Sequence, residues 1–252
     1  MKKSLNICGG IKVACAVAYV CTLGTASVAH ASAAGVEVDI PARFMFIPGG
    51  FDSNDQVQVT LDGYLPNACY KLAQPRIAFD STTHTYTVTT VANSFEADNV
   101  ACGTYVVPYT VSATLGQVPA GDYIIETLGA QKMALHVKES SGVGPDDFLY
   151  APVDHIHVRV DLTQKSIVTS IEGRFTNSCM RWKEIKIIDE GSTVIVIPII
   201  RLEERADCVS REMTYKTMEA MIPWRQPGRY MVHVRGLSGA ATNHVFDVDA
   251  VR

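Results

Sequence analysis

The chain has 252 residues, of which 22 are basic and 26 acidic, so its formal net charge is −4. This acidic balance argues against nucleic acid as a partner, because phosphate binding needs a concentrated basic surface. No apolar run approaches the roughly 20 residues that a membrane-spanning helix needs, so no transmembrane segment is predicted.

The N-terminus has the pattern of a secretory signal peptide. Met1-Lys2-Lys3 precedes an apolar run at residues 13–23, and small residues then offer two cleavage patterns, Ala29-His30-Ala31 and Ala31-Ser32-Ala33. A basic start, a short apolar core and small residues before the cleavage point are typical of export signals. We therefore expect residues 1–33 to be removed and the mature protein to be secreted or periplasmic.

A short motif occurs twice in the remaining chain. Gly63-Tyr64-Leu65-Pro66-Asn67-Ala68-Cys69 is matched 110 residues later by Gly173-Arg174-Phe175-Thr176-Asn177-Ser178-Cys179. In each copy a second cysteine follows, and a tyrosine comes seven residues after it: Cys102 and Tyr109, then Cys208 and Tyr215. Self-similarity at a fixed spacing indicates an internal duplication.

The duplication predicts two tandem domains. We expect one domain over residues 34–141 and a second over 148–252, joined by a linker at 142–147. Residues 140–147 are small, polar and rich in glycine, as linkers are. Of the 19 basic residues that follow the signal peptide, 14 lie after Pro145. This contrast fits either two surfaces with different partners or drift of solvated faces after duplication.

Short runs of alternating apolar and polar residues dominate both copies and predict strands. In the first copy these runs are 56–61, 85–91 and 104–111. In the second copy they are 155–160, 167–171, 182–188, 193–200, 213–221, 229–234 and 245–248. Many short strands with turn residues between them and no long helical pattern indicate an all-β sandwich. Pro108 and Pro198 interrupt apolar runs, which predicts that their strands lie at sheet edges or bulges.

The repeated motif also predicts local geometry. Gly63 and Gly173 each follow an alternating strand, so we expect both to adopt a positive φ in a turn or bulge. Asn67 and Asn177 are expected to hydrogen-bond to the backbone of the same turn.

The cysteines predict two disulfides. Cys8, Cys15 and Cys21 lie in the predicted signal peptide, and the residues before Cys15 and Cys21 fit a lipid-anchor signal poorly. The other four take matching positions in the two copies, and an even number in an exported chain indicates disulfides. A bridge acquired before duplication pairs Cys69 with Cys102 and Cys179 with Cys208. The alternatives are buried free thiols and a zinc site, for which no C-x-x-C pair exists.

Each copy ends on a turn glycine that leads into a tyrosine and alternating apolar residues. Gly121-Asp122-Tyr123-Ile124-Ile125 and Pro227-Gly228-Arg229-Tyr230-Met231-Val232-His233-Val234 resemble the penultimate strand of immunoglobulin-like and fibronectin-III-like modules. The chain is also similar to disulfide-bearing modules of exported bacterial proteins whose role is mostly unassigned. This resemblance implies two tandem immunoglobulin-like β-sandwich domains. The cysteine placement and the absence of tryptophan from the first copy depart from true immunoglobulin domains, so antibody-like recognition loops are not implied.

Catalytic motifs are missing from the sequence. None of the short signatures of serine hydrolases, zinc proteases or nucleotide-binding enzymes occurs, so we expect no catalytic residues and no cofactor. The best metal candidates are His155 and His157, which would share one face of a strand, with His233 or His244 as a further ligand. The alternative reading is a pair of surface histidines. Asp146, Asp147 and Asp154 are weaker candidates for calcium, because they match no EF-hand spacing.

Two tryptophans lie in the second copy, each beside basic residues. Trp182 is interpreted as a core residue or a contact, whereas Trp224 and Arg225 in the turn at 222–227 are the candidate partner-binding residues, since aromatic and arginine side chains dominate binding hot spots. We therefore expect an exported, non-catalytic binding or structural module whose partner is an envelope or extracellular protein or glycan. The alternatives are a secreted hydrolase inhibitor and a metal-binding protein or metal-dependent enzyme.

Overall fold

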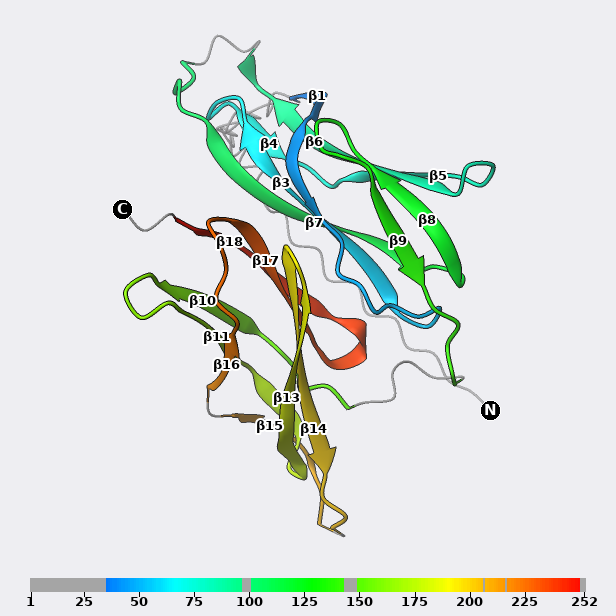
Figure 1. Cartoon of the computed structure of the whole chain (residues 1–252), viewed down its shortest axis with the longest axis vertical. Coiled ribbons are helices and arrows are strands. Elements are labelled where there is room, and N and C mark those ends of the chain that lie inside the picture. The colour runs from blue at the N-terminus through cyan, green and yellow to red at the C-terminus, as the bar shows by residue number, and fades with distance from the viewer. Residues whose placement is uncertain (1–34, 97–100, 143–148, 206, 216, 250–252) are drawn as a thin grey trace, which may run out of the picture. The chain divides into compact units, whose positions relative to one another are not determined.

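The structure is a computed structural model that describes residues 35–96, 101–142, 149–205, 207–215 and 217–249. Residues 34–252 form one compact unit. The described residues contain strands and a short 3-10 helix, η2 (Leu237–Gly239), but no α-helix (Figure 1). The predicted all-β fold class is therefore confirmed. The predicted signal peptide and the linker residues Asp146 and Asp147 lie outside the described residues.

The described residues of the first half form nine strands in two sheets. They are β1 (Val36–Ile40), β2 (Ala42–Phe46), β3 (Gln56–Leu65), β4 (Tyr70–Leu72), β5 (Arg76–Asp80), β6 (Thr85–Ser94), β7 (Val107–Gln117), β8 (Gly121–Glu126) and β9 (Met133–Val137). One sheet has the order β2-β3-β7, and the other has the order β1-β6-β8-β9 with β4 and β5 also paired to β6. Alternate residues of β3, namely Val57, Val59 and Leu61, are fully buried in the core that both sheets share.

Nine strands are also found in the part of the second half that the structure describes. They are β10 (His155–Asp161), β11 (Ser166–Glu172), β12 (Arg174–Asn177), β13 (Met180–Glu190), β14 (Thr193–Leu202), β15 (Ser210–Thr214), β16 (Met218–Ile222), β17 (Gly228–Arg235) and β18 (Ala241–Val248). The sheets have the orders β10-β11-β16 and β13-β14-β17-β18, and β12 pairs with β15. This half has its own main core, in which Ile167 and Ile171 of β11 pack with Val194 of β14 and Val232 of β17.

The two halves have the same strand order and the same pairing directions. The antiparallel set β2-β3-β7 corresponds to β10-β11-β16, and β5-β6-β8-β9 corresponds to β13-β14-β17-β18. Each half contains one parallel pair at the same place, β6 with β8 and β14 with β17. This agreement supports the duplication inferred from the sequence. The parallel pairs differ from the antiparallel sheets that the immunoglobulin-like resemblance implies.

The predicted runs correspond to strands, although β3, β6 and β18 are longer than predicted and two other runs differ more. The run predicted at 104–111 becomes β7, which begins at Val107 and continues to Gln117. The run predicted at 213–221 is divided between β15 and β16, because Tyr215 turns inward and its hydroxyl donates to the carbonyl oxygen of Pro152 at 2.6 Å.

The two prolines differ in their placement. Pro108 lies in β7, an edge strand of its sheet, as predicted. Pro198 lies in β14, which is an inner strand and not an edge. However, the pairing of β14 with β13 shifts register between Trp182 and Glu184, opposite Ile200 and Ile199, so the bulge given as the other possibility lies beside Pro198. The strand tolerates this proline because its pairing with β17 ends at Val196. Beyond that point the carbonyl oxygen of Pro198 accepts a hydrogen bond from the amide of Ala151.

The glycines of the repeated motif do not have the predicted backbone conformation. Neither Gly63 nor Gly173 has a positive φ, so that prediction was wrong. Each glycine instead lies under a tyrosine ring. A Cβ atom at Gly63 would lie 2.8 Å from Oη of Tyr109, and one at Gly173 would lie 2.5 Å from Oη of Tyr215. Glycine is needed here because a side chain from across the strand pair fills its space.

The asparagines of the motif behave as predicted. The side-chain oxygen of Asn67 accepts a hydrogen bond from the amide of Cys69 at 2.8 Å, and that of Asn177 accepts one from Cys179 at 2.7 Å. In both turns the asparagine side chain therefore bonds to the backbone two residues later, which is typical of asparagine turns. The structure also contains both predicted disulfides, Cys69–Cys102 and Cys179–Cys208.

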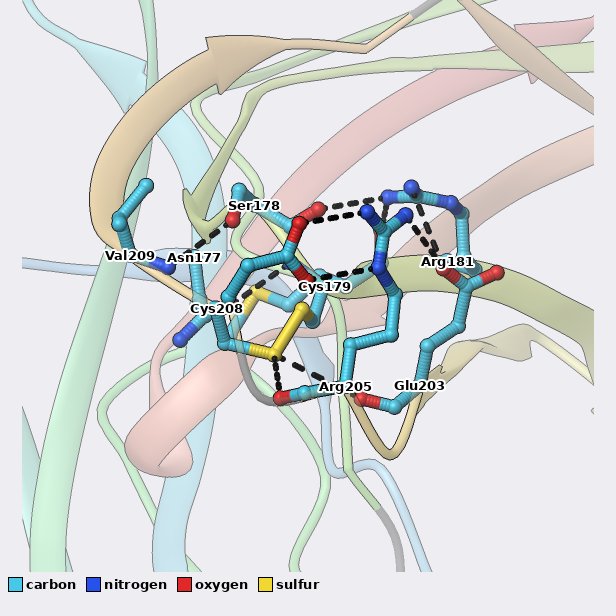
Figure 2. Close-up of polar contacts among 10 residues, drawn as sticks. Asn177, Ser178, Cys179, Arg181, Glu203, Arg205, Cys208 and Val209 are labelled. Atoms are coloured by element: carbon cyan, nitrogen blue, oxygen red, sulfur yellow. Dashed lines mark hydrogen bonds and ion pairs between the residues drawn. A yellow bond between two sulfur atoms is a disulfide. The ribbon is translucent and has the colours of Figure 1, made fainter.

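A closed polar network surrounds the second disulfide (Figure 2). The guanidinium of Arg181 donates to the carbonyl oxygens of Ser178 and Met180 at 2.9 and 2.8 Å, and it faces the Glu203 carboxylate at 3.3 Å. Arg205 pairs with Asp207 at 2.7 Å, which lowers the pKa of that carboxyl. The network holds the ends of β12, β13 and β15 together, and its arginines already have acceptors.

Candidate binding site

Two adjoining surface hollows form a groove beside the start of β17. The first is lined by Ser192, Trp224, Arg225, Gln226 and Tyr230, and the second by Arg43, Phe44, Tyr64, Asp247 and Asp249. Gly228 and Arg229 line both hollows, so the two hollows adjoin at these residues. We call this surface the aromatic groove. Its walls come from β2, β3, β17, β18 and the turn before β17.

Arg229 lies at the centre of the groove and is held by two carboxylates. Its Nε and Nη2 atoms donate to Asp62 at 2.7 and 2.8 Å, and Nη1 donates to Asp247 at 2.5 Å. Asp62 is only 2% exposed and also accepts the hydroxyl hydrogen of Thr110 at 2.8 Å. These hydrogen bonds raise the pKa of Arg229, and the bond with Asp62 has the largest effect. Arg229 is therefore a fixed, charged floor to the groove.

Arg43 is held by aromatic rings. Its guanidinium lies over the ring of Phe44 at 5.4 Å and over the ring of Tyr64 at 5.9 Å. Both distances are within the range of cation–π contacts. Within the described ranges Arg43 has no ion pair with a carboxylate, and both Arg43 and Tyr64 are exposed. The N–H donors of Arg43 therefore face the second hollow without a charged acceptor.

The structure places the predicted contact residues Trp224 and Arg225 in the first hollow. Trp224 is half-buried and packs against the core of the second half. The Arg225 side chain is 11% exposed and forms an ion pair of 2.8 Å with Asp189, whose pKa it lowers. It also lies 5.7 Å from the ring of Tyr230. Arg225 is thus a packed wall of the hollow, and its contact with a partner stays a prediction.

Trp182 is also half-buried and packs against a small core cluster, but it lines neither hollow. Its ring lies 4.9 Å from that of Tyr215 and 5.8 Å from that of Phe175. These three rings belong to one packed cluster, so of the two tryptophans only Trp224 lines the groove.

The turn that carries Trp224 is fixed from inside. The hydroxyl of Tyr230 donates to the carbonyl oxygen of Gln226 at 2.8 Å. The equivalent tyrosine of the first half, Tyr123, donates in the same way to Pro119 at 2.9 Å. A tyrosine that bonds back to the chain four residues earlier closes the corner before its strand. The first hollow is therefore preformed.

The candidate metal ligands are only partly brought together. His155 and His157 are exposed on the same face of β10, as predicted. Burial lowers the pKa of His244, and the charge of the nearby His157 lowers it further. His233 is buried elsewhere and bonds to Asn243 at 2.6 Å. The described residues contain no group of three or more histidine, cysteine, aspartate or glutamate side chains that could hold a metal ion. Asp154 pairs with Arg174 at 2.9 Å.

Comparison with known proteins supports the sandwich fold. Residues 59–132 match the family described as the ORF11 beta-sandwich domain. The matched segment includes Asp62, Tyr64 and both cysteines of the first disulfide. No curated protein and no solved structure matches the chain. Within the described part of the chain, no helix has the length and hydrophobicity needed to span a bilayer.

Sequence reasoning did not find the residues that complete the groove, namely Arg43, Phe44, Tyr64, Arg229, Asp247 and Asp249. One usable signal was Asp62, which continues the apolar strand that includes Val59 and Leu61. A carboxylate in a buried strand requires a cationic or hydrogen-bonding partner. That rule predicts a partner for Asp62, but it cannot identify Arg229, which is 167 residues away.

Proposed function

We propose that this protein is an exported, non-catalytic binding module that holds an envelope or extracellular ligand in the aromatic groove. The observation that carries the proposal is the groove itself: a surface lined by the exposed Tyr64 and the half-buried Phe44, Trp224 and Tyr230, with one guanidinium, Arg43, that has no carboxylate partner among the described residues. Binding sites combine such apolar surface with a few placed polar groups. The two disulfides support export, since they persist in oxidising compartments.

The duplication supports a scaffold role for the rest of the chain. The features shared by both halves are glycine under tyrosine, asparagine turns, disulfides and tyrosine corners. All of them fix the backbone, and none supplies an acid, a base or a nucleophile. We therefore propose a tandem immunoglobulin-like β-sandwich scaffold, altered by one parallel strand pair in each half, that presents the groove.

Retention of ligand from the source organism tests the proposal. Immobilised protein spanning residues 34–252 would be exposed to envelope extract and to culture medium, and the retained material compared with that on Tyr64→Ala and Arg43→Ala variants. We expect one retained component that both variants lose. Tyr105→Ala is the matched control, because Tyr105 is 66% exposed and does not line the groove. Retention that is equal on all variants would refute a binding role for the groove.

A further inference from the structure

The second hollow of the groove presents donors and acceptors of hydrogen bonds side by side. Arg43 and Arg229 contribute guanidinium groups, and Asp247 and Asp249 contribute carboxylates. Asp247 already accepts from Arg229, but a carboxylate has further lone pairs to offer. An anionic ligand would be repelled by the two aspartates and a cationic ligand by the two arginines. The lining therefore favours a neutral ligand whose groups both donate and accept.

The same hollow also has an apolar face. Tyr64 is 41% exposed and lies with Phe44 beside the Arg43 guanidinium. In the first hollow, Trp224 and Tyr230 provide a second aromatic surface. Aromatic rings carry a negative face that attracts the weakly positive hydrogens of C–H groups, as well as burying apolar area. A ligand that fits must therefore combine hydroxyl or amide edges with flat C–H faces.

The groove has two aromatic surfaces, one in each hollow. The two hollows share Gly228 and Arg229 in their linings, and the ring of Tyr230 packs against Gly228. Arg229 is fixed by Asp62 and Asp247, so this part of the floor does not need to reorganise on binding. A chain of linked rings would place one ring over each aromatic surface.

We propose that the aromatic groove binds a neutral oligosaccharide. Pyranose rings have C–H faces that stack on aromatic side chains and hydroxyl groups that both donate to carboxylates and accept from guanidinium groups. This inference rests on the proposed binding function and specifies the class of its ligand. Tyr64 and Trp224 supply the stacking platforms, and Arg43 and Asp247 supply the polar contacts.

Titration calorimetry with defined sugars tests the proposal. The probes are cellohexaose, chitohexaose, maltohexaose and laminarihexaose, titrated into protein spanning residues 34–252. We expect at least one probe to bind with a dissociation constant below about 1 mM. Tyr64→Ala and Arg43→Ala should each weaken that binding by about tenfold or more, while Tyr105→Ala leaves it unchanged. Because the ligand is neutral, raising the salt concentration should change the affinity little.

The outcomes separate the ligand class from the binding function. If none of the four hexaoses binds, or if binding survives both groove variants, the oligosaccharide proposal is overturned. If the groove variants lose a retained component from the extract and protease treatment destroys that component, the ligand is a polypeptide. In that case the binding function stands and the oligosaccharide proposal fails. Circular dichroism of each variant shows whether a loss of binding reflects loss of the fold.

Discussion

At Gly173 the space for a side chain is occupied by the protein's own backbone. A Cβ atom there would lie 2.4 Å from the carbonyl oxygen of Pro152 and 2.5 Å from Oη of Tyr215. We therefore expect Gly173→Ala to lower the free energy of unfolding by about 1 to 3 kcal/mol, the range for overpacking, as measured by urea denaturation. Gly142→Ala is the control, because nothing lies within 4 Å of its Cβ position. Equal stability of the two variants would contradict this account.

His233 should make the protein sensitive to acid. Burial lowers the pKa of His233 to about 4. The hydrogen bond with Asn243 opposes this shift, and the charge of Arg235 adds a smaller effect in the same direction as burial. The nearby Asp55, which faces Arg235, has a pKa raised by its own burial. Because the unfolded chain binds the proton more tightly, the stability due to neutral His233 is complete above about pH 6.5 and is lost as the pH falls toward 4.

The size of this effect follows from the difference between the two pKa values. Between pH 7.5 and pH 4.5 the term from His233 should lower the free energy of unfolding by about 2 to 3 kcal/mol. His233→Gln should remove most of this dependence, and urea denaturation at the two pH values measures it. If the variant keeps the full dependence of the original protein, other groups cause the acid sensitivity.

Predictions about single residues were confirmed where neighbouring residues in the sequence determine the local structure. The asparagine turns at Asn67 and Asn177 depend only on the next two residues, so the sequence contains all that determines them. The role of Gly173 depends on Tyr215, which is distant in the chain and reaches it only through strand pairing. The pairing of Asp62 with Arg229 likewise depends on tertiary structure. Such contacts leave no pattern in a single sequence.

At the scale of elements, the second disulfide ties the start of β13 to the start of β15. Cys179 and Cys208 are separated by 29 residues, and the bridge restricts the unfolded chain. Replacing both with alanine should cost about 2 to 5 kcal/mol. Hydrogen exchange should show lost protection mainly in β12, β13 and β15, with β3 and β7 unaffected.

Removal of the first disulfide is the matched comparison. The bridge between Cys69 and Cys102 closes a loop of similar length, with a separation of 33 residues, so Cys69→Ala with Cys102→Ala should affect the first half instead. Non-reducing peptide mapping should recover Cys69 with Cys102 and Cys179 with Cys208. A bridge between the halves, or equal loss of protection in both halves after either change, would contradict the two-module organisation.

Strand positions could be predicted from the pattern of apolar residues, but strand partners could not. The run at 56–61 became β3, in which Val57, Val59 and Leu61 are buried, and the continuous apolar run at 193–200 became β14, which is buried on both faces over these residues. The parallel pairing of β14 with β17 has no such signal, since it depends on how the chain crosses between sheets. For the same reason, the sequence did not show that Pro198 lies in an inner strand.

At the scale of the whole molecule, each half has its own main core, while polar contacts join the halves within one compact unit. Asp62 pairs with Arg229, and the amide nitrogen of Asn243 donates to Ser112 at 2.8 Å. Arg235 donates to the carbonyl oxygen of Gly49 at 2.6 Å. Separate cores favour the predicted independence of the halves. The polar contacts predict that each half is more stable in the full chain.

Fragments 34–141 and 148–252 should therefore each give a β-rich circular dichroism spectrum and unfold at lower temperature than the full unit. If neither fragment folds alone, the two halves depend on a shared core and the predicted boundary is wrong. The melting temperatures of the two fragments are also the reference values for a variant in which the contact between Asp62 and Arg229 is removed.

Arg229→Ala in the full unit should uncouple the halves. The change leaves the Asp62 carboxylate, 2% exposed, without its guanidinium, and removing one partner of a buried pair costs about 3 to 5 kcal/mol. We expect calorimetry to show two transitions near those of the separate fragments. Asp62→Asn in the same chain removes the unpaired charge and should restore part of the lost stability. If Asp62→Asn gives no recovery, the cost of Arg229→Ala comes from lost packing over Phe44, which the guanidinium covers at 6.0 Å.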